Sequence, residues 1–247
     1  TALLWVETPT NPLMRLVDIE ALAERAHAHD ITVAVDNTFA TPYLQQPLDH
    51  GADLVLHSAT KYLGGHSDLI LGAVCTNSDE WAEKLRFQIK STGAAPGPMD
   101  CFLTLRGTKT LHLRMEQHCS SARRLAQMLN AHDKVGHVRY PGLPSHPGHA
   151  LAQKQMSDYG GMISFELADD EMDKALAVLD AAEVFTLAES LGGVESLIEH
   201  PASMTHASIP AEEREKIGLT DSLIRLSVGV ESFEDLRDDL DRALSRV

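Results

Sequence analysis

The first half of the chain alternates short strand-like runs rich in β-branched residues with stretches of helical periodicity. The strand-like runs lie at residues 2–6, 32–35, 53–56 and 69–75. Between the first two runs, apolar residues recur at helical spacing over residues 16–26, and Asp18 and Glu20 lie where the macrodipole favours acids. Strands and helices in this order form βαβ units, which build a mostly parallel sheet covered by helices. We therefore predict an α/β fold for this half.

The second half of the chain is organised differently. A Gly- and Pro-rich turn at residues 93–98 precedes a helical pattern over about residues 108–130, which is long enough to bridge two domains. Further strands and helices are predicted at residues 162–167, 171–182, 223–228 and 233–244. We predict a large domain over residues 1–112 and a smaller C-terminal α+β domain over residues 113–247.

Composition excludes several classes of protein. Asp and Glu number 36 against 21 Lys and Arg, so the net charge of −15 provides no basic surface for nucleic acids or anionic membranes. No apolar run approaches the roughly 20 residues that a membrane span needs. The three cysteines, Cys75, Cys101 and Cys119, form no CxxC pair and are expected to be reduced thiols. We expect a soluble, cytoplasmic protein.

A lysine with two hydroxyl neighbours follows the third strand-like run. Lys61 comes directly after Thr60 and three residues after Ser58. Ligands of α/β sheets bind outside the carboxyl ends of the strands, and a desolvated amine there has the lowered pKa that Schiff-base chemistry needs. Taken alone, however, a lysine near a turn is more often a surface charge, and Ser or Thr at a strand end is commonly a local cap.

Two further polar residues follow neighbouring strands. Asp36 comes at the end of the second run and Asn11 follows the first, so both are expected at the same sheet edge as Lys61. A pyridoxal phosphate site needs a lysine, an acid that keeps the pyridine nitrogen protonated, and hydrogen-bond donors for O3′ and the phosphate. Singly, Asp36 could be a helix cap and Asn11 a turn residue. Together the three predict a pyridoxal phosphate site, to which Ser58 and Thr60 would add phosphate-binding hydroxyls.

An arginine lies inside the apolar run at residues 223–228. An unpaired guanidinium is costly to bury, so we expect Arg225 to have an anionic partner. That partner is either an acid of the chain itself or the carboxylate of a ligand.

Several motifs, spread in order over the whole chain, carry a family resemblance. They are ETPTNP, VDNTFATP, HSATKYLGGHSD, YPGLPSHPGH, LAESLGGVESLIEHPASMTH and SLIRLSVGVE. Together they resemble the Cys/Met-metabolism family of fold-type I pyridoxal phosphate enzymes, which includes the cystathionine γ-lyases and γ-synthases. The resemblance implies an aspartate aminotransferase-like fold and a homo-oligomer, expected to be a tetramer.

The resemblance also implies the roles of the cofactor-binding residues. Lys61 would form the Schiff base and move protons, and Asp36 would contact the pyridine nitrogen. Ser58 and Thr60 would contact the phosphate, and Asn11 would lie near O3′.

Three residues of the second half are implied to bind the substrate. Arg225 matches the arginine that holds the α-carboxylate in a bidentate fork, and Ser190 matches a serine that helps to seat the same carboxylate. Glu189 resembles the acid of cystathionine γ-lyases and γ-synthases that faces the distal part of the substrate, where methionine γ-lyases tend to carry an apolar residue. A solvated loop acid is the alternative for Glu189, and a turn residue before two glycines is the alternative for Ser190.

The resemblance therefore predicts a pyridoxal phosphate-dependent enzyme acting at the γ-carbon of a small amino-acid substrate. Cystathionine γ-lyase activity is favoured, with γ-synthase activity close behind, and the sequence does not decide between elimination and replacement. A methionine γ-lyase or O-acetylhomoserine sulfhydrylase-type relative is the alternative within the family.

Two other features bear on this prediction. His146 and His149 invite a metal site, but Pro147 and Gly148 make this segment a turn without a third ligand, so we expect no metal. The chain starts directly with a strand-like run and lacks the family's N-terminal segment, including the tyrosine that stacks on the cofactor. We therefore expect it to be part of a longer protein, and a catalytically silent interaction protein is the alternative from another class.

Overall fold

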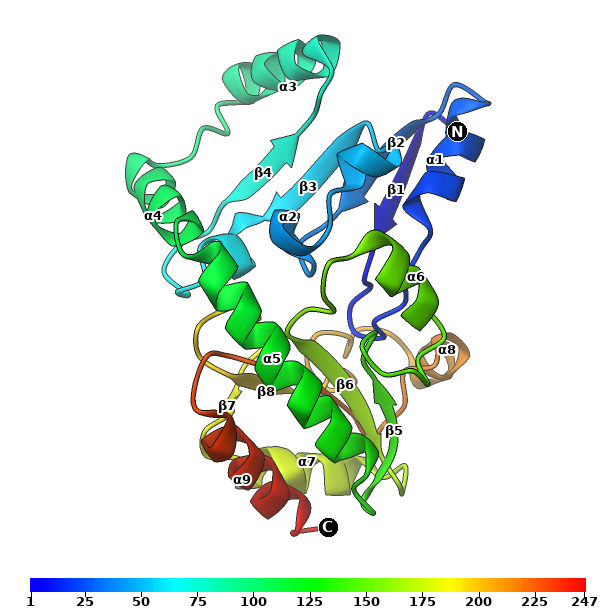
Figure 1. The fold of residues 1–247 in the computed structure, drawn as a ribbon, viewed down its shortest axis with the longest axis vertical. Helices are drawn as coiled ribbons and strands as arrows, with labels where there is room; N and C mark the ends of the chain where they lie inside the picture. The colour runs from blue at the N-terminus through cyan, green and yellow to red at the C-terminus, as the bar shows by residue number, and fades with distance from the viewer.

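Two β-sheets, one in each half of the chain, organise the computed structural model, which describes residues 1–247 (Figure 1). The first sheet has the strand order β1-β2-β3-β4. Its strands are β1 (Leu3–Glu7), β2 (Thr32–Asp36), β3 (Leu54–Ser58) and β4 (Gly72–Cys75). The first three strands are parallel, as predicted, and β4 runs antiparallel to β3 at the edge. Glu7 is paired in register with Asp36, and Asp36 with Leu56, so the carboxyl ends of the three parallel strands meet at one edge.

The helix between β1 and β2 forms for the reason the sequence indicates. The Asp18 side chain caps α1 (Ile19–His27) by accepting a hydrogen bond from the Ala21 backbone N–H at 3.0 Å. Asp18 is thus the cap of the helix and Glu20 lies in its first turn. The buried face of α1 packs with β2 in an apolar cluster of eight residues. This βαβ unit confirms the prediction for the first half.

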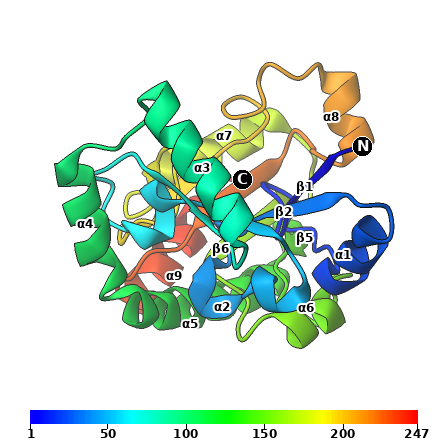
Figure 2. The same ribbon diagram turned by 90° about the horizontal axis from the view of Figure 1, so that it is seen from above.

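The region after β4 contains the helix predicted over about residues 108–130 and, before it, a helix where the sequence predicts a turn. Its helices are α3 (Asp79–Thr92), α4 (Pro98–Thr108) and α5 (Leu111–Asn130). The prediction missed α4 because Pro98 was interpreted as part of a turn, whereas proline is also a favoured first residue of a helix. Seen from above, α1 and α4 lie on opposite sides of the molecule (Figure 2).

Helix α5 contributes to the apolar cores of both halves. Met115 and Cys119 lie in the cluster that includes residues around the first sheet, and Leu125 and Leu129 lie in the large core of the second half. The long helix descends from one sheet to the other in Figure 1. A domain boundary near residue 112 stays a prediction, since α5 packs against both sides of it.

The second sheet has the order β5-β6-β9-β8-β7. Its strands are β5 (Val135–Arg139), β6 (Met162–Leu167), β7 (Thr186–Leu187), β8 (Leu197–Glu199) and β9 (Leu223–Ser227). The remaining helices are α2 (Thr41–Leu44), α6 (His149–Gln155), α7 (Met172–Ala181), α8 (Ala211–Ile217) and α9 (Phe233–Leu244). The predicted strands and helices of this half are confirmed, while β7, β8 and α8 are too short to give a periodic pattern.

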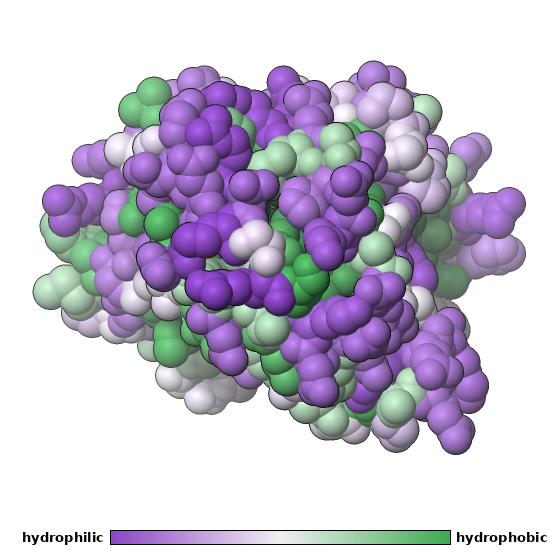
Figure 3. All heavy atoms as spheres, turned by 90° about the horizontal axis from the view of Figure 1, so that it is seen from below, coloured by the Kyte–Doolittle hydropathy of each residue, from purple (hydrophilic) through white to green (hydrophobic).

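The face below α7 and α9 is mainly hydrophilic, with apolar side chains gathered in a central hollow (Figure 3). Leu236, Leu240 and Leu244, one helical turn apart on α9, are fully buried in a core of 22 residues. No helix of the structure has the length and apolar character of a membrane span.

Candidate functional site

Lys61 lies where β3 turns into the short helical segment Ala59–Leu63. Its backbone has φ −90° and ψ −130°, which interrupts the helical conformation of that segment. Arg114 of α5 fixes the next residue, because its Nη1 donates to the Tyr62 carbonyl at 2.7 Å. The Lys61 carbonyl in turn accepts from the Gly65 N–H at 2.7 Å. Two hydrogen bonds therefore hold the turn from which the Lys61 side chain extends.

A loop of the second half approaches Lys61 closely. The Lys61 amine donates to the Ser190 hydroxyl at 2.9 Å. Two residues further on, Gly192 has φ +75°, and a Cβ there would lie 2.7 Å from the Tyr62 backbone nitrogen. Only glycine allows this approach, so the paired glycines after Ser190 explain how that serine reaches Lys61.

Arg225 of β9 is the centre of the same region. Its Nη2 donates to the backbone carbonyls of Glu189 (2.7 Å) and Ser190 (2.9 Å), and its Nη1 donates to Asn11 Oδ1 at 2.9 Å. Its Nη2 also lies 2.9 Å from Glu199 Oε2, in an ion pair whose side chains are 2% and 0% exposed. The predicted anionic partner of Arg225 is thus an acid of the chain itself. We call Asn11, Lys61, Ser190, Glu199 and Arg225 the arginine cluster.

Burial sets the electrostatics of the arginine cluster. Burial and the neighbouring Arg225 charge lower the pKa of Lys61, and Glu199 partly opposes this effect. Burial raises the pKa of Glu199 to about 7, although Arg225 acts in the opposite direction. Burial likewise lowers the pKa of the Arg225 guanidinium. A lysine with a lowered pKa holds its proton less tightly, which is a requirement for an amine that has to act as a base or nucleophile.

A second group of polar residues surrounds Asp36. Asp36 Oδ1 accepts from both the Thr38 hydroxyl (2.6 Å) and the Thr38 backbone N–H (3.0 Å). The Thr38 hydroxyl accepts from the Ser58 N–H at 2.8 Å, which ties Asp36 to the end of β3. The Thr60 hydroxyl accepts from the Leu71 N–H at 3.0 Å. We call Asp36, Thr38, Ser58 and Thr60 the aspartate cluster.

The aspartate cluster borders open space. Ser58 and Thr60 line a cavity of about 1070 Å³ between β4 and α3. The Ser58 hydroxyl makes no hydrogen bond within the chain, and Oδ2 of Asp36 accepts none. This cluster therefore keeps polar atoms free for a ligand, whereas the arginine cluster satisfies most of its own and leaves the buried Arg225 Nε and Glu199 Oε2 without a hydrogen-bond partner.

The structure brings the predicted residues into two clusters that the chain joins through Ser58–Lys61, and in the second of them Thr60 bonds only Leu71. Asn11, expected near a cofactor oxygen, has its side-chain carbonyl on Arg225. Glu189 contacts Arg225 only through its backbone carbonyl, and its side chain is exposed. No group of three or more His, Cys, Asp or Glu side chains in the structure could hold a metal ion.

Sequence reasoning missed two residues of the site, Glu199 and Thr38. The sequence does carry a signal for Glu199. It is an acid at the end of the apolar strand Leu197–Glu199, just as Arg225 is a base inside the apolar strand Leu223–Ser227. The two face each other in register between β8 and β9. Thr38 carries no comparable signal, since a hydroxyl two residues after an aspartate is common in turns.

The whole chain resembles one family of enzymes. The profile of the family described as "Cys/Met metabolism PLP-dependent enzyme" matches residues 1–245. The cystathionine γ-lyase of Dictyostelium discoideum is 54% identical over 246 residues, and a cystathionine β-lyase of Lactococcus lactis is 58% identical over the same length. These alignments include 100% of this chain but 63% and 64% of the relatives. The chain thus spans less than two thirds of the length of these curated relatives.

Solved structures agree with the sequence comparison. The cystathionine γ-synthase of Xanthomonas oryzae pv. oryzae superimposes with a TM-score of 0.96 at 50% identity, over 99% of this chain and 63% of that structure. A cystathionine γ-lyase of Micromonospora echinospora also gives 0.96, at 47% identity and with 64% of its chain covered. These neighbours confirm the predicted fold class, that of fold-type I enzymes.

Proposed function

This chain belongs to the Cys/Met metabolism family of PLP-dependent enzymes, and from that premise we propose that it acts on the γ-carbon–sulfur bond of cystathionine. Cleavage by γ-elimination is favoured, and formation of the same bond from an activated homoserine ester and cysteine is the replacement form of the reaction. The observation that carries the proposal is the arginine cluster, in which the Lys61 amine and the Arg225 guanidinium share one partner, Ser190. An amino acid needs these two groups, one for its α-carboxylate and one for the proton on its α-carbon.

The residues of the aspartate cluster fit pyridoxal phosphate. Asp36 has a free carboxylate oxygen for a protonated pyridine nitrogen, and the unpartnered Ser58 hydroxyl and the Thr60 hydroxyl suit a phosphate. The half-buried Lys61, whose pKa is lowered by burial, suits Schiff-base chemistry. When bound, this cofactor supplies an electron-poor ring that stabilises negative charge at the substrate α-carbon.

In this proposal each residue of the two clusters has a separate role in the reaction. Arg225 would hold the α-carboxylate with N–H donors that the chain leaves free, among them its buried Nε, while Asn11 and the carbonyls of Glu189 and Ser190 orient the guanidinium. Lys61 Nζ takes the proton from the α-carbon, a task for which its lowered pKa prepares it. Asp36, held by Thr38, keeps the pyridine nitrogen protonated.

A second candidate is β-elimination of cystathionine. It is favoured by the relatives from Lactococcus lactis and Coxiella burnetii, which are named cystathionine β-lyases and are 56–58% identical to this chain. The two reactions break different bonds of the same substrate. With uptake of one water, elimination at the γ-carbon releases cysteine, 2-oxobutanoate and ammonia, and elimination at the β-carbon releases homocysteine, pyruvate and ammonia.

Glu189 is proposed to recognise the distal ammonium group of the substrate. The backbone carbonyl of Glu189 accepts a hydrogen bond from Arg225. This places the exposed Glu189 side chain beside the arginine cluster. Because a methionine side chain has no charge at its end, this residue disfavours the methionine γ-lyase alternative.

We also propose that the protein is a homo-oligomer, expected to be a tetramer, and that it works in the cytoplasm. Large apolar side chains are exposed on α3 and α4, where Phe87, Met99, Phe102 and Leu105 are each at least 60% exposed. A patch of this kind is typical of a protein–protein interface. Size-exclusion chromatography with light scattering measures the assembly directly.

The experiment that tests the function is a product assay on cystathionine with the purified, cofactor-supplemented full-length protein. Release of 2-oxobutanoate with cysteine supports γ-elimination, and release of pyruvate with homocysteine supports the second candidate. Addition of cysteine and an activated homoserine ester tests the replacement reaction. A protein that stays colourless and releases neither keto acid would contradict both candidates and favour an interaction protein.

A further inference from the structure

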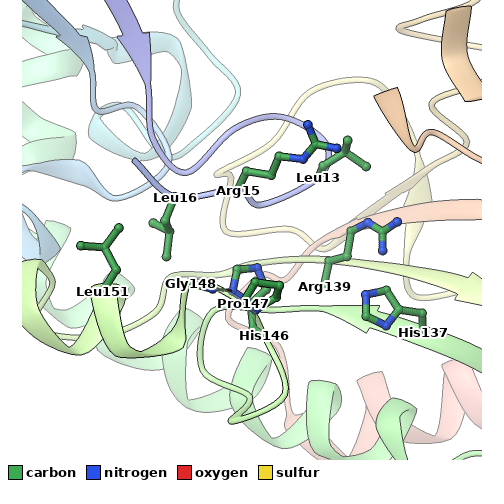
Figure 4. A pocket seen from close by; sticks show the side chains of 9 residues that line it. All are labelled: Leu13, Arg15, Leu16, His137, Arg139, His146, Pro147, Gly148 and Leu151. Atoms are coloured by element: carbon green, nitrogen blue, oxygen red, sulfur yellow. Dashed lines mark hydrogen bonds between the residues drawn. The ribbon is translucent and has the colours of Figure 1, made fainter. Parts of the chain in front are cut away.

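A cavity outside both clusters lies between the two halves of the molecule (Figure 4). Its volume is about 530 Å³, within the range of small-molecule sites. Three segments form its walls: the loop after β1, strand β5, and the loop that leads into α6. None of the residues of the arginine or aspartate cluster lines it.

The walls of this cavity carry positive charge in an acidic protein. Arg15 and Arg139 line it, and none of the 36 acidic residues of the chain does. Arg139 is paired with Glu166 at 2.6 Å just outside the lining, so the positive charge that the chain leaves unpaired in this cavity is the guanidinium of Arg15. Such a site attracts anions.

Both guanidiniums keep free donors. Arg15 is exposed and uses only Nη2, which donates to the Ile217 carbonyl at 2.6 Å. Arg139 also uses only Nη2, which donates to Glu166 at 2.6 Å and to the Gly218 carbonyl at 3.3 Å. The remaining N–H groups of each arginine make no hydrogen bond within the chain.

His146 has a structural role in the wall. It is buried, and its Nδ1 accepts from the Gly148 N–H at 3.0 Å. Burial lowers its pKa, so it contributes shape rather than charge. Gly148 allows close packing here, because a Cβ at this position would lie 2.8 Å from Leu16 Cδ1.

The cavity is also divided by polarity. In Figure 4, Leu16 and Leu151 lie toward one end, and Arg139 and His137 lie toward the other. A ligand that fits both ends has an anionic group joined to an apolar body. We propose that this cavity is a binding site for a small organic anion, a carboxylate or phosphate ester that carries an aromatic or branched aliphatic group.

The test measures binding directly with three probes that share a phenyl body: phenyl phosphate, benzoate and benzylamine. The cofactor-loaded protein is used, so that the catalytic phosphate position is filled. Isothermal titration calorimetry is expected to show binding of one or both anions and none of the cation. Tighter binding of phenyl phosphate identifies a phosphate site, and tighter binding of benzoate identifies a carboxylate site.

Variants place the binding in this cavity. Arg15→Gln is expected to weaken anion binding about tenfold, because it removes a charged donor from an exposed position. Arg139→Gln is expected to weaken it similarly, although this change also leaves Glu166 without its partner. Arg25→Gln, which removes an exposed arginine from α1, is the matched control and is expected to bind like the unchanged protein.

Three results would overturn the proposal. They are a lack of binding by both anions, equal affinity in the unchanged protein and Arg15→Gln, and equal binding of benzylamine. Binding is measured without catalytic activity, so its outcome is independent of the proposed function.

Discussion

The arginine and aspartate clusters differ in how far the chain itself satisfies their polar groups. Arg225 is 2% exposed and has an ion pair and three hydrogen-bond acceptors within the chain. The aspartate cluster borders a cavity, and its Ser58 hydroxyl has no partner. The difference indicates that the arginine cluster is largely preorganised before a ligand arrives, with the Arg225 Nε as a buried donor still open to one, whereas the aspartate cluster is completed by a ligand.

Burial of the Glu199–Arg225 ion pair costs free energy of folding. Glu199 occupies the Nη2 side of Arg225, where a carboxylate ligand would also be attracted. Taking two charges out of water costs several kcal/mol per ion unless their geometry and hydrogen bonds repay it. The buried pair therefore holds the guanidinium in place, and the charge of Glu199 tunes how strongly Arg225 attracts a second carboxylate.

The largest expected effect comes from the residue that joins the two clusters. Lys61→Ala is expected to lower kcat on cystathionine by at least about a thousandfold, since no other amine replaces a group that acts on the reacting atoms. Borohydride reduction followed by peptide mapping is expected to label Lys61 in the unchanged protein. An adduct on Lys84, Lys90 or Lys109 would contradict the site assignment.

The next effect tests the arginine cluster. Arg225→Lys is expected to raise the KM for cystathionine while leaving the cofactor bound, because a point charge cannot replace the bidentate fork. Truncating a desolvated charge pair costs roughly 2–5 kcal/mol. Steady-state kinetics and the visible spectrum of the bound cofactor provide the two readouts. An unchanged KM in a folded variant would contradict the role of Arg225.

The charge state of Glu199 gives a pH-dependent prediction. Its pKa is about 7 in the folded protein and near 4.5 in the unfolded chain, so the folded state binds more protons between these values. The free energy of unfolding therefore falls as pH rises from 4.5 through 7. Urea unfolding at pH 5 and pH 8 is expected to show this loss, and Glu199→Gln is expected to reduce it.

The pH range above this interval is a control for the effect of Glu199 on stability. Above pH 8 Glu199 is ionised in both states, so its contribution to the slope vanishes. The same loss of stability in the unchanged protein and in Glu199→Gln would mean that another group titrates.

A smaller effect tests the aspartate cluster. Thr38→Val is expected to weaken pyridoxal phosphate binding about tenfold, because Asp36 loses its hydroxyl donor and the Ser58 N–H loses its acceptor. Cofactor titration followed by absorbance measures the change. Thr108→Val, which removes an exposed hydroxyl from α4, is the control and is expected to leave the affinity unchanged. Equal affinity in both variants would remove Thr38 from the site.

The smallest effect concerns substrate choice. Glu189→Val is expected to lower kcat/KM for cystathionine several-fold more than for a shorter sulfur amino acid, because only cystathionine carries a distal charged end. The ratio of the two kcat/KM values is the measurement. An equal loss on both substrates would make Glu189 a solvated loop acid.

The local pattern of the sequence determined the α/β order and the placement of polar residues at strand ends. Period and strand-end chemistry are properties of a few neighbouring residues, so Asp36 and Lys61 could be assigned to one sheet edge from the sequence. Helix α9 and strand β6 follow the same local rules, and their predicted bounds agree with the structure.

The family resemblance assigned roles to these residues, but only the tertiary structure decided their partners. Glu199 and Arg225 are 26 residues apart in the chain, and their ion pair exists because β8 and β9 align in register. Asn11 meets Arg225 across 214 positions of sequence. Which acid neutralises a buried base depends on long-range packing, and no local propensity encodes that choice.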